Sequence, residues 1–499
     1  MRRLLLSVFA VTVLVGLASQ TLAAEPPGII LLMGDDHGWD ETGYNGHQHV
    51  KTPVLDEMAA TGLRLDRFYS AHPSCSPTRA SIITGRHPNR CGTFSPNWSI
   101  RPGEPSIAQI LKDTGYRCGH FGKWHLGPVK ADSPTNPGAL GFDEWLSHDN
   151  FFELNPVLSR NGAAPQMIKG ESSEIIIDET IRFIREAKQA NKPFFAIVWF
   201  GSPHEPYEGL PEDLALYDDL PESYADRKVS LTDLKTGKPV NRSFRDVLRE
   251  RLAEITAMDR AIGTLRDYLK TSGQRDNTLV WYCGDNGVPS SGRLDIPFRG
   301  QKGLIYEGGT RVPGVIEWPT KITEPRTSDV NAVTTDMLPT LCEIVGAPLP
   351  NRPLDGISLT KLFDGSLTSR PQPIGFWMYD TSLEAKRGLK PTIAPELQEG
   401  TTPLVKMMAG KYTRSFRNFV HPDFNEDDYA GPRSILDNEF KLVVDGKPGG
   451  SSEGELFNLR NDPAEKQNLS QKHPEVAARL GKQLREWQTS VLTSLKTGE

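Results

Sequence analysis

Cysteine is scarce in this chain of 499 residues, which has only five, at positions 75, 91, 118, 283 and 342. So few cysteines exclude a fold that depends on a dense disulfide framework. If Cys75 is consumed by a modification, the other four allow at most two bridges, in three pairings. Cys118 and Cys283 lie within apolar, strand-like runs, which favours buried and mostly reduced thiols.

Long apolar runs are also rare. The only one, LLLSVFAVTVLVGLA at residues 4–18, follows Arg2 and Arg3 and precedes the small residues Thr21 and Ala23. This pattern predicts a secretory signal peptide over residues 1–23, and the run is too short to serve well as a membrane span. We therefore expect a secreted or periplasmic protein with no stable membrane insertion.

Blocks of positive charge are missing as well. The formal net charge is −6, from 57 basic and 63 acidic residues, and no basic cluster interrupts the balance. A mildly acidic chain of this kind is a poor binder of nucleic acid or of an anionic membrane surface. Nucleic acid is therefore not an expected partner.

Apolar strands alternate with amphipathic helices along the first two thirds of the chain. This alternation predicts an α/β domain over residues 24–365, with a mostly parallel, mixed sheet between layers of helices. The strands are expected at 28–33, 63–71, within 106–127, at 194–200 and at 277–283, and the helices at 52–62, 173–190 and 248–269. Residues 222–245 are interpreted as a surface loop.

The pattern breaks at FDGSLTSRPQP, residues 363–373. Beyond it, short strand candidates and one final helix predict a small C-terminal α+β domain with an antiparallel sheet over residues 366–499. The strand candidates are 373–379, 411–416, 440–446 and 455–459, and the helix lies within 474–495. Residues 390–403 are interpreted as a mobile loop.

Two pairs of polar residues follow predicted strands directly. Asp35 and Asp36 follow the first strand, and Asp285 and Asn286 follow the strand at 277–283. Strand ends of a parallel sheet converge, and adjacent buried carboxylates require a cation. Oxygen ligands of this kind favour Ca²⁺ or Mg²⁺ over zinc, although a single Asp-Asp pair is more often a solvated turn.

Cys75 lies in a Ser- and Pro-rich turn that opens a predicted helix, within AHPSCSPTRASIITGR at 71–86. Backbone N–H groups and the helix dipole favour an anion at such a position, which suits a nucleophile that attacks an anionic ester. A buried structural cysteine is the alternative.

Candidate acid, base and anion-binding residues lie elsewhere in the chain. Lys123 and His125 alternate along what reads as an extended segment, so both side chains are expected on the side opposite Trp124. His204 follows the strand at 194–200, and Lys302 lies in a glycine-rich loop. Taken singly, each of these residues is more often structural or solvated than catalytic.

Taken together, these motifs resemble the type I sulfatases, which share an alkaline-phosphatase-like superfold. The matching segments are C-x-P-x-R with Thr84-Gly85, G-K-W-H-L-G, D-N-G, S-P-H-x-P, E-G-G-x-R-V-P and the sequence ELFNLRNDPAEKQNL at 455–469. Thr78 replaces the usual Ser, and Ile83 replaces the usual Leu. The resemblance implies that a maturation enzyme oxidises Cys75 to formylglycine, whose hydrate is the nucleophile.

The resemblance also implies a role for each residue of these motifs. The implied Ca²⁺ ligands are Asp35, Asp36, Asp285, Asn286 and the formylglycine made from Cys75. Lys123 steadies the hydrate and His125 takes its proton, while His204 and Lys302 act at the bridging oxygen of the ester. Arg79 is expected to hydrogen-bond the formylglycine. The structural residues of the signature are Glu307, Gly308, Gly309 and Arg311.

The segment GFDEW at 141–145 resembles sulfatases that act on N-acetylgalactosamine 6-sulfate, which implies an exo-acting carbohydrate sulfatase. Trp145 stacks on a sugar or is simply buried, and His148, Asp149 and Asn150 are candidates for binding hydroxyls. Two alternatives remain. One is a phosphate mono- or diester hydrolase of the same superfold, and the other is a non-catalytic glycan-binding relative with an unmodified Cys75.

Overall fold

The structure is a computed structural model that describes residues 25–499 except 234–235, 237, 295–296, 405–411 and 447–453. The predicted signal peptide at 1–23 lies outside the described residues. Within the described part of the chain, no helix is both long enough and apolar enough to cross a membrane.

A ten-stranded mixed sheet forms the large domain, in the order β14-β2-β13-β11-β1-β8-β4-β5-β6-β7. Its five central strands are all parallel, which confirms the predicted mostly parallel, mixed sheet. These strands are β11 (Thr278–Gly284), β1 (Gly28–Gly34), β8 (Phe194–Trp199), β4 (Arg117–Lys123) and β5 (Glu144–His148). The flanking strands are β14 (Arg326–Ser328), β2 (Leu63–Leu65), β13 (Gly314–Glu317), β6 (Val157–Arg160) and β7 (Gln166–Met167).

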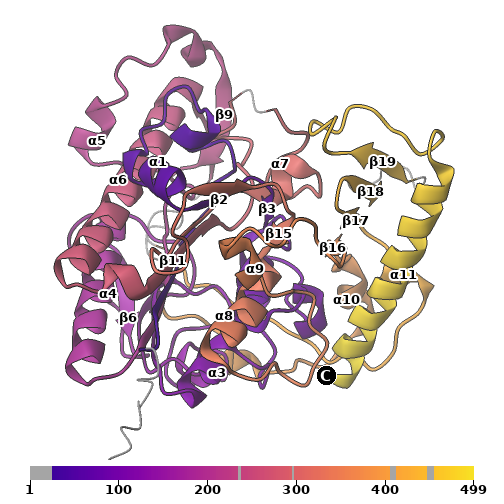
Figure 1. Cartoon of the computed structure of the whole chain (residues 1–499), viewed down its shortest axis with the longest axis horizontal. Helices are drawn as coiled ribbons and strands as arrows, with labels where there is room; N and C mark the ends of the chain where they lie inside the picture. The colour runs from indigo at the N-terminus through magenta and orange to yellow at the C-terminus, as the bar shows by residue number, and fades with distance from the viewer. Residues whose placement is uncertain (1–24, 234–235, 237, 295–296, 405–411, 447–453) are drawn as a thin grey trace, which may run out of the picture.

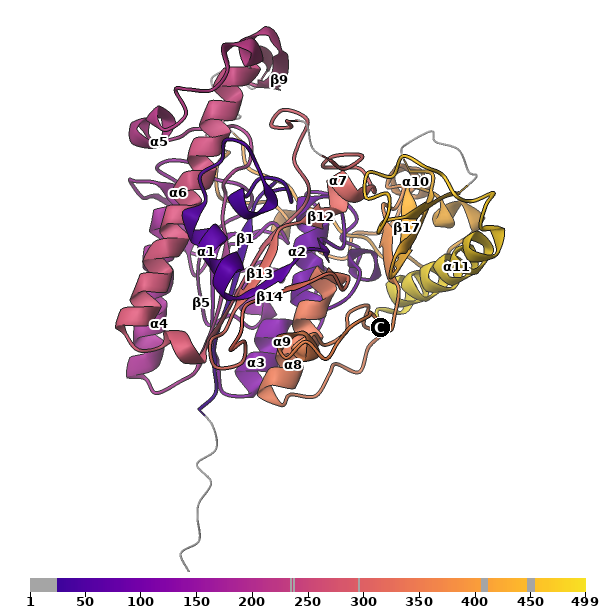
Figure 2. The same ribbon diagram turned by 45° about the horizontal axis from the view of Figure 1, so that its top comes forward.

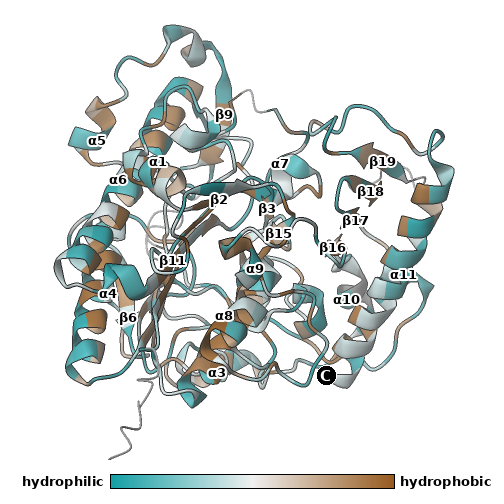
Figure 3. Ribbon diagram, viewed as in Figure 1, coloured by the Kyte–Doolittle hydropathy of each residue, from teal (hydrophilic) through white to brown (hydrophobic). Residues whose placement is uncertain are grey.

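Both faces of this sheet are covered by helices (Figures 1 and 2). On β1, Ile29 and Leu31 pack into one apolar core and Ile30 and Leu32 into the other, which explains the unbroken apolar sequence of the strand. One face carries α1 (Pro53–Thr61), α4 (Ser172–Gln189) and α6 (Phe244–Thr271); the other carries α2 (Cys75–Thr84), α3 (Ile107–Asp113), α8 (Met337–Val345) and α9 (Thr360–Phe363). Figure 3 shows the central strand β11 in brown between helices that mix brown and teal.

A second, four-stranded antiparallel sheet follows, in the order β16-β17-β18-β19, with the long helix α11 packed on it. This is the predicted C-terminal α+β domain. Its elements are β16 (Ile374–Trp377), β17 (Arg433–Asp437), β18 (Phe440–Val444), β19 (Glu455–Asn458) and α11 (Pro474–Thr497).

Three local predictions differ from the structure. The expected loop at 222–245 contains an antiparallel hairpin of β9 (Lys228–Thr232) and β10 (Pro239–Ser243), whose polar strands lack a clear alternating pattern. The strand expected at 411–416 is wrong for its described part, where Ser415 makes a single bridge to Glu399, and the sheet uses β17 instead. In the expected mobile loop at 390–403, Thr402 is buried against the large domain.

Two buried ion-pair clusters join the C-terminal domain to the large domain. In the first, Asp355 accepts from both the Nε and Nη2 atoms of Arg90, at 2.7 and 2.8 Å, and from the indole N–H of Trp487 on α11 at 2.8 Å. In the second, Lys441 on β18 lies 3.0 Å from both Glu307 and Glu465. Burial alone would raise the pKa of Asp355, but Arg90 holds it below its usual range.

We expect the substitution Asp355→Asn to destabilise the protein by about 3–5 kcal/mol, because it keeps the shape of the side chain but leaves Arg90 buried without its counter-charge. The effect should be measured by denaturant unfolding at pH 7. Since the pKa of Asp355 is lowered in the folded state, its stabilisation is present above the unfolded-state value of about 3.9 and is lost as the pH falls below it. The difference between wild type and variant should therefore shrink below about pH 4.

Glu426→Gln is the matched control, because Glu426 pairs with Arg485 of α11 on the exposed surface. We expect a change within about 0.5 kcal/mol for this control. Equal stabilities of Asp355→Asn and the control would contradict the proposed role of Asp355.

Candidate active site

The two predicted acidic turns meet at the carboxyl end of the large sheet. Strands β1 and β11 pair in register down to Gly34 and Gly284, so the residues that follow them lie side by side. The backbone N–H of Asp36 donates to Asp285 Oδ1 at 2.7 Å, and Asn286 Nδ2 donates to Asp36 Oδ1 at 2.8 Å. The structure therefore brings all four predicted residues together.

Each carboxylate of this cluster has its own cation. Lys123 Nζ lies 2.6 Å from Asp35 Oδ2, and Lys302 Nζ lies 2.6 Å from Asp36 Oδ1. Arg79 donates to Asp285 Oδ2 at 3.1 Å and to the Lys123 carbonyl oxygen at 3.1 Å, with its guanidinium over the ring of Trp199. Arg79 is fully buried, so a surface role is excluded.

The pKa values reflect this pairing. Burial raises the pKa of Asp35, but Lys123, His204 and Arg79 outweigh it and hold the pKa well below its usual range. Burial and the neighbouring charge of Asp35 raise the pKa of Asp285 to about 7, despite Arg79. Three carboxylates packed this closely therefore retain an unmet demand for positive charge.

Cys75 is the first residue of α2, as predicted, and only 2% of its surface is exposed. Its Sγ lies 4.0 Å from Asp36 Oδ1. Burial raises the pKa of the Cys75 thiol to about 12, even though Lys123 and Lys302 oppose the shift. The unmodified residue is therefore a thiol at neutral pH, and the thiolate, which is the nucleophilic form, is scarce.

His125 and Lys123 both reach the site, but the predicted extended segment between them is wrong. Strand β4 ends at Lys123, and His125 has a φ of 55°, in the left-handed region that a side chain rarely adopts. Trp124 meanwhile stacks on Trp199 in the core. Asn97 Oδ1 lies 3.1 Å from His125 Nε2, which makes Nε2 the protonated nitrogen and leaves the buried Nδ1 without a partner.

His204 lies beside Lys302, at 3.4 Å between Nε2 and Nζ, and 3.7 Å from Asp36 Oδ2. The ring of Phe151 stacks on it with centroids 4.5 Å apart. Burial lowers the pKa of His204 to about 4, so at neutral pH the ring is neutral. Asp36 raises the pKa of Lys302 against the effect of burial, so Lys302 carries the charge of this pair.

The donor set fits a divalent cation. One ligand atom each from Asp35, Asp36, Cys75 and His204 lies within 4.8 Å of the others. Asp35 Oδ1 and Asn286 Oδ1 are buried and have no hydrogen-bond partner. Hard cations prefer oxygen atoms of this kind. Both oxygens of Asp285, in contrast, already accept hydrogen bonds from the protein.

Arg251 on α6 is a site residue that sequence reasoning missed. It pairs with both carboxylate oxygens of Glu41 at 2.6 Å and donates to the carbonyl oxygens of Asp36 and Pro203 at 2.6 and 2.5 Å. It thereby ties together the loops after β1 and β8. In the sequence it is one charged residue on an amphipathic helix, so no local signal distinguishes it.

The motif glycines permit close backbone packing. A Cβ atom at Gly287, in the D-N-G motif, would lie 1.9 Å from the carbonyl oxygen of Gly308, and one at Gly309 would lie 1.9 Å from that of Leu304. Any larger residue would push the loop that carries Lys302 away from the Asp285 turn. The predicted structural role of this glycine-rich segment follows from that contact.

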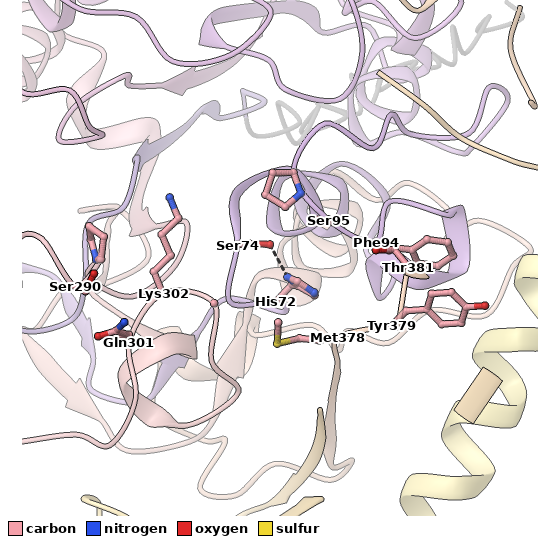
Figure 4. Close-up of a pocket in the computed structure, with 13 residues that line it drawn as sticks. His72, Ser74, Phe94, Ser95, Ser290, Gln301, Lys302, Met378, Tyr379 and Thr381 are labelled. Carbon is pink, nitrogen blue, oxygen red and sulfur yellow. Dashed lines mark hydrogen bonds between the residues drawn. The ribbon is translucent and has the colours of Figure 1, made fainter. Parts of the chain in front are cut away.

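A pocket of about 180 Å³ opens above Cys75 and is lined by His125, His204, Lys302 and further residues. Those not predicted as catalytic are Pro96, Asn97, Asn150, Phe151, Glu205 and Arg414. A second cavity of about 540 Å³ shares Pro96 and Lys302 with it. Figure 4 shows this cavity between Lys302, Gln301 and Ser290 on one side and Phe94 and Tyr379 on the other, with His72 and Ser74 between them.

The substrate-binding candidates at 145–150 separate into two groups. Asn150 lines the small pocket. Trp145 is 8% exposed and its indole N–H points to the carbonyl oxygen of Val129 at 3.3 Å, so it is buried rather than available to a sugar. Asp149 is structural, because it accepts from the backbone N–H groups of Val129 and Thr402 at 2.8 Å each.

Comparison with known proteins agrees with this geometry. The profile of the family described as Sulfatase matches residues 27–347. The chain belongs to the sulfatase family. It is a sulfuric ester hydrolase.

Individual relatives of this sulfatase are distant. Human arylsulfatase A is 30% identical over 496 residues, which covers 92% of this chain and 86% of that protein. N-acetylgalactosamine-6-sulfatase of Canis lupus familiaris is 29% identical over 411 residues, 73% of this chain and 71% of that protein. Among solved structures, Ps i-CgsB in complex with k-i-k-neocarrahexaose superposes with a TM-score of 0.73 at 22% identity and 93% coverage of both chains.

Proposed function

We propose that this sulfatase is a Ca²⁺-dependent, exo-acting carbohydrate sulfatase whose nucleophile is formylglycine made from Cys75. The observation that carries this proposal is the position of Cys75, buried at the start of α2 against the paired carboxylates and cations. A thiol with a pKa of about 12 is a poor nucleophile there. Hydrated formylglycine would supply one hydroxyl to attack sulfur and a second to release sulfate.

The burial of Cys75 also constrains its maturation. A modifying enzyme cannot reach a side chain that is 2% exposed at the base of a pocket. The partner of this chain is then a formylglycine-generating enzyme that acts before the large domain folds. Export through the predicted signal at 1–23 to the periplasm or the outside is consistent with such an early step.

Asp35, Asp36 and Asn286 are the residues that would hold Ca²⁺, since two of their oxygens are buried without partners and all are hard ligands. Bound there, the ion would neutralise charge on the sulfate oxygens. Asp285 orients the site by fixing Asp36 and Arg79. Lys123 and Lys302 add two fixed positive charges in a site from which water is largely excluded, where electrostatic stabilisation is strongest.

His125 is positioned as the base. Its Nε2–H is held by Asn97, so Nδ1 is free to take a proton from the second hydroxyl and drive sulfate release. Its pKa is held well below 6.5 by burial and by Lys123, so the ring is neutral and ready to accept that proton. On the other side, Lys302 stabilises the oxygen of the departing alcohol, and neutral His204 orients Lys302.

The two cavities support the proposed substrate class. The small pocket of about 180 Å³ is below the range of roughly 300–1,000 Å³ typical of drug-sized ligands, so it suits one sulfated sugar. The adjoining cavity offers Ser74, Ser95 and Gln301 beside Phe94 and Tyr379, which suits the next sugar of a chain. A relative named for N-acetylgalactosamine 6-sulfate supports a sulfated amino sugar or a related sugar.

We expect Cys75 to be converted to formylglycine when the protein is made with a maturation enzyme. A tryptic peptide containing residue 75 should be lighter than encoded and should react with a hydrazide in mass spectrometry. Cys75→Ala should bind a sulfated sugar yet release no sulfate, because it lacks any nucleophile. Repeated turnover by the unmodified Cys75 protein at an undiminished rate would contradict the mechanism. A Cys75 that stays unmodified beside the maturation enzyme, in a protein that binds the sugar without releasing sulfate, would favour the glycan-binding alternative.

We expect Ca²⁺ to bind the folded protein and stabilise it by about 2.7 kcal/mol at 100 times its dissociation constant. Asp35→Asn should abolish most of this gain, because it removes the carboxylate with the free Oδ1. Asp218→Asn, at an exposed ion pair with Arg249, should retain it. Calorimetric titration and thermal unfolding with and without chelator measure both. Equal Ca²⁺ stabilisation of Asp35→Asn and wild type would contradict this assignment.

We expect sulfate at a chain end to be removed faster than the same sulfate inside a polymer, because the small pocket admits one sugar. Released sulfate should be compared for terminally and internally sulfated oligosaccharides of equal length. Faster release from internal positions would overturn the exo-acting assignment while leaving the sulfatase activity intact.

A further inference from the structure

Arg414 is a cation in the catalytic pocket that the proposed chemistry does not use. It comes from the C-terminal domain and lines the small pocket together with Cys75, His125 and Lys302. Among the described residues, its buried Nε has no hydrogen-bond partner. Burial lowers the pKa of Arg414, although Cys75 opposes the shift.

The backbone around Arg414 is firmly held, so the guanidinium is not a loose surface group. The Gly400 N–H donates to the Arg414 carbonyl oxygen at 2.7 Å, Ser415 bridges to Glu399, and Arg417 bridges to Trp98. The neighbouring segment at Glu399 and Gly400 and Trp98 of the large domain thus hold the backbone close to and on the C-terminal side of Arg414. An arginine held this way presents its planar donors with little further loss of freedom on binding.

The ion pairs of the site do not include the Arg414 guanidinium. Asp35, Asp36 and Asp285 are matched by Lys123, Lys302 and Arg79 in pairs. Arg414 takes no part in these pairs, and Glu205, the other carboxylate that lines the pocket, accepts a hydrogen bond from the backbone N–H of Thr232. A half-buried guanidinium with an unpaired Nε–H favours an oxyanion, because a carboxylate or sulfate accepts two parallel N–H bonds from one guanidinium.

The position of Arg414 relative to the scissile group limits where that anion lies. The Phe151 ring stacks on His204 and also lies 5.9 Å from the Arg414 guanidinium carbon, so it is placed between these two groups. With the sulfate to be removed held at Lys302 and His204, Arg414 on the Phe151 side of the same pocket would meet a different substituent of the sugar. Asn150 also lines the small pocket, and its Oδ1, which has no hydrogen-bond partner, can accept a hydrogen bond from a hydroxyl.

We propose that Arg414 binds a second anionic group, a carboxylate or a second sulfate, on the sugar that carries the sulfate to be removed. This inference rests on the proposed carbohydrate sulfatase activity and adds the substrate class: doubly charged sugars, either disulfated or sulfated uronic acids. Arg414 is a specificity residue that contacts the substrate away from the reacting sulfur.

The test compares three substrates that carry the same scissile sulfate: a sugar with no other charge, its disulfated counterpart, and its uronic acid counterpart. Wild type should prefer at least one doubly charged sugar by about ten- to a hundred-fold in kcat/KM, the factor expected for a charge-assisted hydrogen bond. Arg414→Gln should reduce that preference to within about three-fold, chiefly through KM, because the contact is made equally in the bound and transition states.

Two further variants make the result specific. Arg414→Lys keeps the charge but not the paired donors, so it should retain part of the preference. Arg417→Gln, three residues on, removes an arginine that lies over Trp98 outside the pocket and should keep the wild-type preference. If Arg414→Gln fails to fold, Arg414→Lys and wild type still decide the question, because an unchanged preference in the lysine variant would count against the paired contact.

The outcomes separate the two proposals. Release of sulfate from none of the three sugars by modified wild type overturns the carbohydrate sulfatase proposal. Release without preference for a doubly charged sugar, or a preference that Arg414→Gln leaves intact, overturns the assignment of Arg414 alone. The substrate that shows the preference identifies the second group as carboxylate or sulfate.

Discussion

The structure depends on burying three carboxylates and three cations at one end of a parallel sheet. Asp35, Asp36 and Asp285 could not be ionised together in this interior without Lys123, Lys302 and Arg79. Removing one member of such a set strands a buried charge at a cost of about 3–5 kcal/mol. Arg79 lies on α2, Lys123 at the end of β4 and Lys302 in a glycine-rich loop. Three segments that are distant in the sequence must therefore pack together at the site.

This packing explains two backbone conformations that would be unfavourable on their own. Asp36 and His125 adopt left-handed backbone conformations, with φ values of 64° and 55°, that only a well-determined surrounding structure sustains. Arg251 supplies part of that surrounding by holding the carbonyl oxygens of Asp36 and Pro203. The loops after β1 and β8 are thereby fixed before any ligand arrives, and preorganised charge is what stabilises a developing negative charge most effectively.

The sheet and the cluster of acidic residues could be predicted from the sequence, because short local sequence patterns indicate both. The strand at Gly28–Gly34 is a continuous apolar run, and the acidic pairs directly follow strands. Arg251 and Arg414 escaped notice because their roles come from tertiary contacts: one lies on an ordinary amphipathic helix, and the other lies in a segment mistaken for a strand of the small sheet. The conformation of His125 was also missed, since K-W-H reads equally well as a continuing strand.

The two domains contribute different parts of the site. Residues that form the charged cluster all precede residue 303, whereas Arg414 and the Tyr379 wall of the larger cavity come from the C-terminal domain. Lys441 holds that domain through a buried ion pair with Glu307, and Asp355, which is paired with Arg90 of the large domain, accepts from the indole N–H of Trp487 on α11. The reaction centre therefore rests on the large sheet, while the shape and charge of the entrance depend on how the smaller domain docks. Changes in the segment around Arg414 can then alter which sugar is accepted without disturbing the carboxylates and cations that carry out the chemistry.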